Sequence, residues 1–124
     1  MSNYEFSEII VNLTIDRNTD RVKTWTMYPG NLLYVTPVDL TNCSGVVQVF
    51  SDPSLKTSLL TISSAAPGAN GGIVLGGALG TLTLSALKPS SLLFGPGSFP
   101  WKWYHTWADG TTVTMMRGNW IVRA

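Results

Sequence analysis

Residues that could carry out chemistry are few in this chain of 124 residues, and His105 is its only histidine. His105 lies between Trp103 and Trp107 in an alternating stretch, with no cysteine near it, so a metal site lacks ligands. We therefore expect His105 to lie at the edge of the core, with a hydrogen bond to Thr114 or to a main-chain carbonyl. No metal ion and no cofactor is expected.

Other catalytic patterns are also missing from the sequence. Serines are frequent, but none lies in a Gly-x-Ser-x-Gly turn of the kind that hydrolases use. Asp39, Asp52 and Asp109 fall at turn-like positions, which does not suit paired carboxylates. The glycine-rich run from Gly71 to Gly80 is not followed by Lys-Ser or Lys-Thr, as a phosphate-binding loop would be. The sequence therefore predicts a protein that is not an enzyme.

Composition narrows the classes of partner. Charged residues make up 12% of the chain and the net charge is +1, so no overall field attracts nucleic acid or anionic lipid. Surfaces so poor in charge associate readily, which indicates a component of an assembly. The single cysteine, Cys43, predicts a buried or half-buried free thiol. The sequence shows neither a secretory signal nor an apolar run long enough to span a bilayer, so we expect assembly in a reducing cytoplasm.

The strongest structural signal is the stretch from Phe99 to Val122, which holds four of the five tryptophans. Large apolar residues alternate on both sides of Asp109 and Gly110. That pattern predicts a β-hairpin closed by a two-residue type I′ turn at Asp109-Gly110. Because a turn fixes the register, each residue of one strand can be assigned a partner on the other.

The register predicts two different faces. One face holds Trp107 opposite Thr112, His105 opposite Thr114, Trp103 opposite Met116, Trp101 opposite Gly118, and Phe99 opposite Trp120. The other holds Thr106 opposite Val113, Tyr104 opposite Met115, and Lys102 opposite Arg117. We expect the first face to form the core and the indole of Trp101 to cover Gly118. The core residues are then Trp101, Trp103, Trp107, Met116, Gly118 and Trp120. Lys102, Tyr104 and Arg117 remain outside as candidate partner contacts.

The opposite placement of rings and cations also bears on nucleic acid. Single-strand binding needs aromatic rings that face a positively charged groove, so a core stripe is the better interpretation. We therefore expect no nucleic acid partner and no membrane partner.

The rest of the chain reads as short strands separated by glycine and proline turns. We expect residues 1–8 to form a flexible N-terminal arm and residues 9–124 to form a single β-sandwich domain. The expected strands are 9–15, 22–27, 32–35, 46–50, 59–62, 73–75 and 79–84, and residues 85–94 allow one or two turns of helix. The predicted fold is all-β, an immunoglobulin-like antiparallel β-sandwich of about seven to nine short strands with at most one short helix.

Several short motifs carry a resemblance to a known family. They are Lys23-Thr-Trp-Thr26, Pro37-Val-Asp-Leu-Thr41, Gly80-Thr-Leu-Thr-Leu-Ser85, Asp109-Gly110, Met115-Met-Arg-Gly118 and Trp120-Ile-Val122. Over residues 9–122 the chain resembles the small immunoglobulin-like domains of tailed bacteriophages related to the N-terminal domain of baseplate upper proteins. Those domains link receptor-binding proteins or fibres to the tail.

The resemblance implies a virion structural protein, assembled in the cytoplasm of a bacterial host. It would be present in several symmetric copies and would dock on other virion proteins of the tail or baseplate. One alternative is a capsid decoration, cement or neck protein. A further alternative is a carbohydrate-binding module with Trp25 or Trp107 as the sugar platform.

Overall fold

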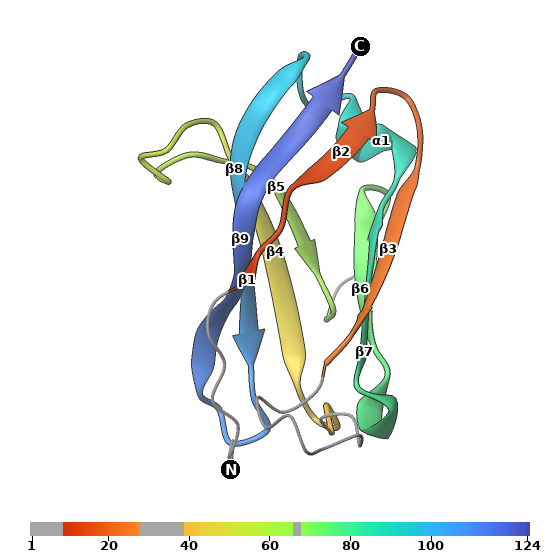
Figure 1. The fold of residues 1–124 in the computed structure, drawn as a ribbon, viewed down its shortest axis with the longest axis vertical. Helices are drawn as coiled ribbons and strands as arrows, with labels where there is room; N and C mark the ends of the chain where they lie inside the picture. Colours follow the sequence, from red (N-terminus) through yellow and green to blue (C-terminus); the bar gives the residue numbers. More distant parts are fainter. Residues whose placement is uncertain (1–8, 28–38, 66–67) are drawn as a thin grey trace.

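The computed structural model describes residues 9–27, 39–65 and 68–124, which form two β-sheets packed face to face (Figure 1). The strands are β1 (Ile9–Ile10), β2 (Leu13–Asp16), β3 (Arg21–Thr26), β4 (Ser44–Phe50), β5 (Ser58–Ser63), β6 (Gly71–Leu75), β7 (Thr81–Ala86), β8 (Gly97–Thr106) and β9 (Thr112–Arg123). A 3-10 turn, η1 (Gly77–Leu79), and one short helix, α1 (Lys88–Ser91), complete the described elements. The strand predicted at 32–35 lies outside the described residues.

Strand order defines the architecture. The large sheet has the order β1-β9-β8-β4-β5, with β2 also on β9, and the small sheet has the order β3-β7-β6. This division of the strands is that of an immunoglobulin-like sandwich, so the predicted fold class is confirmed. All pairs are antiparallel except those of β1 and β2, which both run parallel to β9.

One predicted strand is interrupted. Residues 9–15 alternate as a single strand would, yet the structure divides them into β1 and β2. Both segments keep the same register on β9, with Ile9 opposite Met116 and Leu13 opposite Trp120. The interruption at Val11 and Asn12 therefore leaves the register intact.

The core lies between the two sheets and is built by alternation along each strand. Val47 and Val49 of β4 face Leu82 and Leu84 of β7 across the interior, and all four are buried. Trp25 of β3 also meets Trp103 of β8 edge-on, with ring centroids 6.1 Å apart. Antibody domains join these same two strands by a disulfide, and here two aromatic rings make the contact.

Helix α1 lies near one end of the sandwich, in the part of the chain where helix was expected (Figure 1). Pro89 lies in its first turn, where the missing N–H is not needed. The Lys88 N–H donates to Asp20 Oδ1 at 2.6 Å, and the Asn18 N–H donates to Ser91 Oγ at 2.7 Å. These bonds attach the helix to the turn between β2 and β3.

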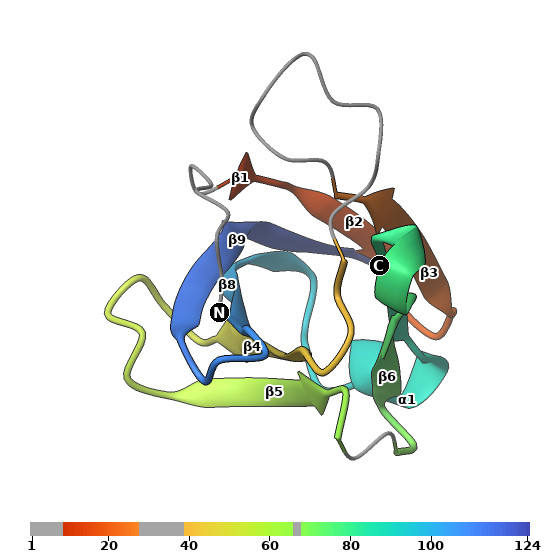
Figure 2. The same ribbon diagram turned by 90° about the horizontal axis from the view of Figure 1, so that it is seen from below.

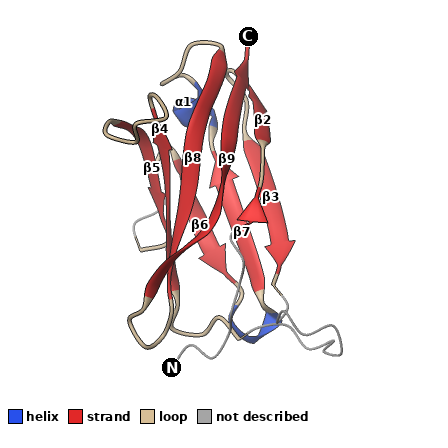
Figure 3. Ribbon diagram, turned by 60° about the vertical axis from the view of Figure 1, so that its left-hand side comes forward, coloured by secondary structure: helices blue, strands red, loops and turns tan. Residues whose placement is uncertain are grey.

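The hairpin of β8 and β9 contains the two longest strands, with 10 and 12 residues (Figure 3). Its turn differs from the prediction. The Gly110 N–H donates to the Trp107 carbonyl at 2.9 Å, and the Trp107 N–H donates to the Thr111 carbonyl at 2.8 Å. Gly110 has a φ of 90°, whereas Asp109 is not among the residues with positive φ. A type I′ turn needs positive φ at both, so the loop is a three-residue one that ends on a left-handed glycine.

A β-bulge corrects the register further along the hairpin. Trp103 lies opposite Met116 and Trp101 opposite Gly118, as predicted, but Tyr104 lies opposite Thr114. The predicted pairs nearer the turn are therefore wrong by one residue, and Met115 has no residue opposite it. The bulge turns Met115 inward, where it is buried beside Met116, although Met115 was expected on the outer face.

Candidate functional site

The side chains expected in the core are enclosed by the sandwich. Trp101, Trp103, Trp120 and Met116 are fully buried, and Trp107 is 5% exposed. Trp25 is half-buried and in contact with Trp103. Trp107 is therefore enclosed, whereas Trp25 keeps part of its side chain exposed.

Gly118 is where three segments of the large sheet meet. A Cβ added there would lie 1.9 Å from the Val11 carbonyl oxygen and 3.1 Å from Asn12 Oδ1. The same carbonyl accepts a hydrogen bond from Trp101 Nε1 at 2.8 Å. The indole of Trp101, which lies opposite Gly118, thus reaches across β9 at this glycine, and backbone of the interrupted strand fills the space that a side chain at Gly118 would need.

His105 is completely buried, with its ring edge-on to Trp107 at a centroid separation of 4.7 Å. Neither ring nitrogen has a hydrogen-bond partner among the described residues, so the expected bond is not formed. The bulge explains the difference, since it places Val113 rather than Thr114 opposite His105. Burial lowers the pKa of His105 to about 4, so the ring is neutral at pH 7.

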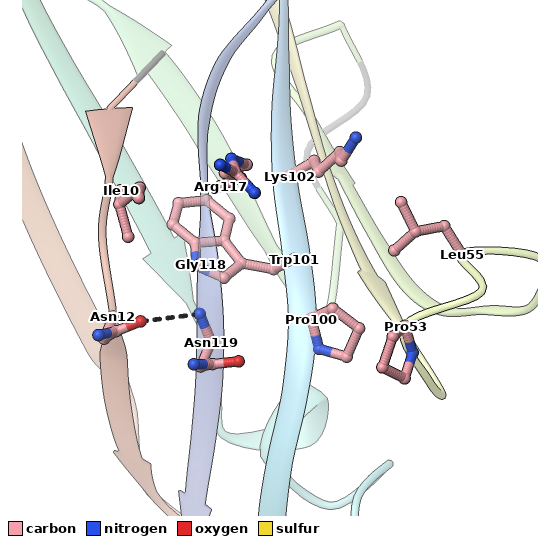
Figure 4. A pocket seen from close by; sticks show the side chains of 10 residues that line it. All are labelled: Ile10, Asn12, Pro53, Leu55, Pro100, Trp101, Lys102, Arg117, Gly118 and Asn119. Atoms are coloured by element: carbon pink, nitrogen blue, oxygen red, sulfur yellow. Dashed lines mark hydrogen bonds between the residues drawn. The ribbon is translucent and has the colours of Figure 1, made fainter.

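A groove of about 420 Å³ crosses the outer face of the large sheet (Figure 4). Strands β8 and β9 form its floor, the β1 edge forms one side, and the loop between β4 and β5 forms the other. The residues that line it are Ile10, Asn12, Pro53, Leu55, Pro100, Trp101, Lys102, Arg117, Gly118 and Asn119. None of these side chains is acidic.

Strand pairing arranges the lining residues in two rows. Ile10 lies opposite Arg117, and Arg117 lies opposite Lys102, so two cations follow an apolar side chain across the sheet. In the second row Pro100 lies opposite Asn119, whose N–H donates to Asn12 Oδ1 at 3.0 Å. Pro100 is tolerated in β8 because the pairing with β4 reaches only to Trp101, so its missing N–H interrupts no bond on that side.

Leu55 reaches the groove from the loop between β4 and β5, and its backbone is unusual. Its φ is 59°, a left-handed value that non-glycine residues other than Asn and Asp seldom adopt. Asp52 holds this conformation, because its carboxylate accepts the Ser54 N–H at 2.9 Å and its carbonyl accepts the Leu55 N–H at 3.2 Å. The loop projects beyond the sheet in Figure 2.

Two of the three predicted contact residues, Lys102 and Arg117, lie together in this groove. Tyr104 is half-buried on the same strand as Lys102 but does not line it. Sequence reasoning assigned Trp101 and Gly118 to the core and did not identify the remaining lining residues. Only Pro100 carried a signal, since a proline within a strand marks a position with an unpaired side.

The described residues include no candidate metal site. Within 9–27, 39–65 and 68–124, no group of three or more His, Cys, Asp or Glu side chains could hold a metal ion. The Cys43 thiol is half-buried, and burial is the main reason that its pKa is raised. In the part of the chain that the structure describes, no helix is long and apolar enough to cross a membrane.

Comparison with known proteins identifies no function for this groove. No model of a protein family matches the chain, and no curated protein matches its sequence. Functional inference therefore rests on the groove and on the residues that build it.

Proposed function

We propose that the chain is a non-enzymatic structural protein of a bacteriophage virion, an adaptor that links the tail or baseplate to fibres or receptor-binding proteins. The observation that carries the proposal is the groove on the large sheet. It combines two cations with exposed apolar side chains, and it contains no carboxylate or histidine that could transfer a proton. Such a surface is suited to binding another protein, and the resemblance to phage tail domains supplies the setting.

The sheet edges support an arrangement in several symmetric copies. Among the described residues, β5 pairs only with β4 and β6 pairs only with β7, so each has an edge on which another strand could be added. The low charge of the chain favours such contacts. The partners would be other virion proteins, with assembly in the host cytoplasm.

Particle fractionation tests the proposal. Virions from cells that produce the chain are purified on a density gradient, and tails are sheared from heads before both fractions are analysed by mass spectrometry. We expect the chain in the tail fraction at a low copy number. Absence from purified particles would contradict the virion role. Retention on heads in hundreds of copies would instead assign the chain to capsid decoration, and a few copies on tail-less heads would assign it to the neck.

A further inference from the structure

We infer that two copies of this chain pair through the β6 edge of the small sheet, about a two-fold axis at Val74. This inference rests on the proposed assembly in several copies and names the edge that forms the contact. Its supports are the open backbone groups of β6, the exposure of Val74 and the lack of charge on this edge.

The free edge of β6 presents backbone groups that can still form hydrogen bonds. The Gly71 N–H donates to the Gly68 carbonyl at 3.1 Å, and the Gly71 carbonyl accepts the Gly68 N–H at 2.9 Å. Gly68 lies outside β7, so both groups of Gly71 face away from β7. Because groups of alternate residues along a strand point to the same side, those of Ile73 and Leu75 also face away from β7. Among the described residues β6 pairs only with β7, so these N–H and carbonyl groups have no backbone partner.

The open groups of β6 are complementary to those of a second copy. In an antiparallel pair centred on Val74, Ile73 of one copy lies opposite Leu75 of the other. Residues opposed in this way exchange two hydrogen bonds, and the two-fold axis generates the same pair twice. Every open group of both residues is then used. The second copy does not compete with Gly68 for the edge at Gly71, because its own strand ends at Leu75.

Val74 lies at the centre of this pairing, on the outer face of the small sheet. Its side chain is 65% exposed, although that of Ile73 beside it is buried. The N–H and carbonyl of Val74 face β7, so two copies of Val74 form a pair without mutual hydrogen bonds, in which the Cα atoms approach to about 4.5 Å. Apolar β-branched side chains that meet in this way stabilise a sheet.

The other sheet edges are less suited to pairing with a copy of themselves. Strand β3 carries Arg21 and Lys23, and charges on an edge strand oppose its pairing with another strand. The register of β5 on β4 shifts between Val49 and Phe50, and such an irregularity has the same effect. The edge formed by β1 and β2 is interrupted between them. By contrast, β6 and its neighbour β7 hold no charged residue and no proline, so their approach brings no like charges together.

The pairing would join the small sheets of two copies into one continuous sheet. The contact is short, and small interfaces associate weakly between free molecules. Copies held side by side in an assembly have a high effective concentration, so that a weak contact is sufficient there. The β6 edge is therefore suited to a contact that forms as copies are gathered.

Sedimentation velocity of the full chain, at concentrations up to about 1 mM, tests this inference. We expect reversible dimerisation of the native sequence. Val74→Glu and Val74→Lys should each weaken dimerisation about tenfold or more, because each places like charges opposite each other at the axis. An equimolar mixture of the two variants should dimerise again, since a residue at a two-fold axis meets its own copy.

Val22→Glu is the matched control. Val22 is 53% exposed on β3, and it lies on the same outer face as Val74, because the two valines are opposite Ser85 and Thr83 of β7. This variant should dimerise like the native chain, and circular dichroism should show that all the variants keep the β-sheet fold.

Three results would overturn the inference: a native chain that stays monomeric up to about 1 mM, dimerisation that Val74→Glu leaves intact, or a mixture of folded Glu and Lys variants that stays monomeric. These results concern the β6 edge alone, whereas absence from purified particles would overturn only the adaptor role.

Discussion

The carbonyl group of Val11 connects three segments of the large sheet at a single atom. It accepts the indole N–H of Trp101 and lies against the Cα of Gly118, while the Val11 N–H donates to the Arg117 carbonyl at 2.8 Å. Because the contact is with backbone, it cannot be relieved by turning a side chain. The interruption between β1 and β2 is therefore a site of close packing.

Substitution of Gly118 by alanine should be strongly destabilising. The new Cβ would overlap the Val11 carbonyl, so the edge strand would have to move away from β9. We expect a loss of about 3 kcal/mol in the free energy of unfolding, measured by urea denaturation. Gly95→Ala is the control, since a Cβ at Gly95 meets nothing within 4 Å. Equal effects of the two substitutions would contradict this packing.

His105 should make stability depend on pH. Its pKa is about 4 in the folded chain and about 6.5 when unfolded, so between these values the unfolded chain binds more protons. The contribution of His105 to the free energy of unfolding is therefore fully present above pH 6.5. It falls as the pH decreases toward 4, by up to about 1.4 kcal/mol per pH unit. Urea denaturation across this range should show the slope, and His105→Phe should remove it. An unchanged slope in the variant would mean that other groups cause it.

Single residues show how far sequence reasoning reaches. Lys102 and Arg117 could be placed on the outer face because a turn and a period of two determine which way a strand residue points. The surroundings of His105 and Gly118 could not be predicted in the same way. A β-bulge sets the neighbours of His105, and a strand segment distant in sequence sets those of Gly118. The residues around these two positions give no local sign of either feature.

At the scale of elements, the hairpin gives the clearest comparison. Asp-Gly suits a two-residue type I′ loop, but it also suits a three-residue loop with glycine in the left-handed position, and the sequence alone does not distinguish them. A two-residue loop predicts pairs near the turn that differ by one residue from those in the structure. The bulge at Met115 restores the predicted pairing beyond it, which is why Trp101 and Phe99 have the expected partners.

The turn itself can be tested at Gly110. Its φ of 90° disfavours any Cβ, so Gly110→Ala should cost about 1 kcal/mol of unfolding free energy. Gly110→Asn should cost less, because asparagine tolerates left-handed backbone. Thermal or urea denaturation of both variants measures the difference. Equal stability of all three proteins would contradict the left-handed conformation.

At the scale of the whole molecule, the sandwich was predictable and the groove was not. Short alternating stretches separated by turns predict two packed sheets, even where the individual strand pairs are not known. The groove, by contrast, takes residues from β1, β8, β9 and the loop between β4 and β5, which are brought together only by the strand order. Its position depends on tertiary arrangement, for which local patterns carry little information.

The parallel pairing of β1 and β2 with β9 also has a mechanical consequence. Ile9 lies beside Met116 at one end of this pairing and Asp16 lies beside Arg123 at the other (Figure 1). Tension between the start of β1 and the end of β9 would slide the strands along each other, so that all their hydrogen bonds carry the force together. Tension between Arg17 and Arg123, which share one bond of 2.8 Å, would instead open the bonds one after another.

Single-molecule stretching should therefore give a severalfold higher unfolding force through residues 9 and 124 than through residues 17 and 124. Similar forces in the two directions would show that this edge is not the resisting element. If the expected difference is found, the domain can transmit a pull along its long axis without opening, a property that a link between a tail and a fibre under load would need.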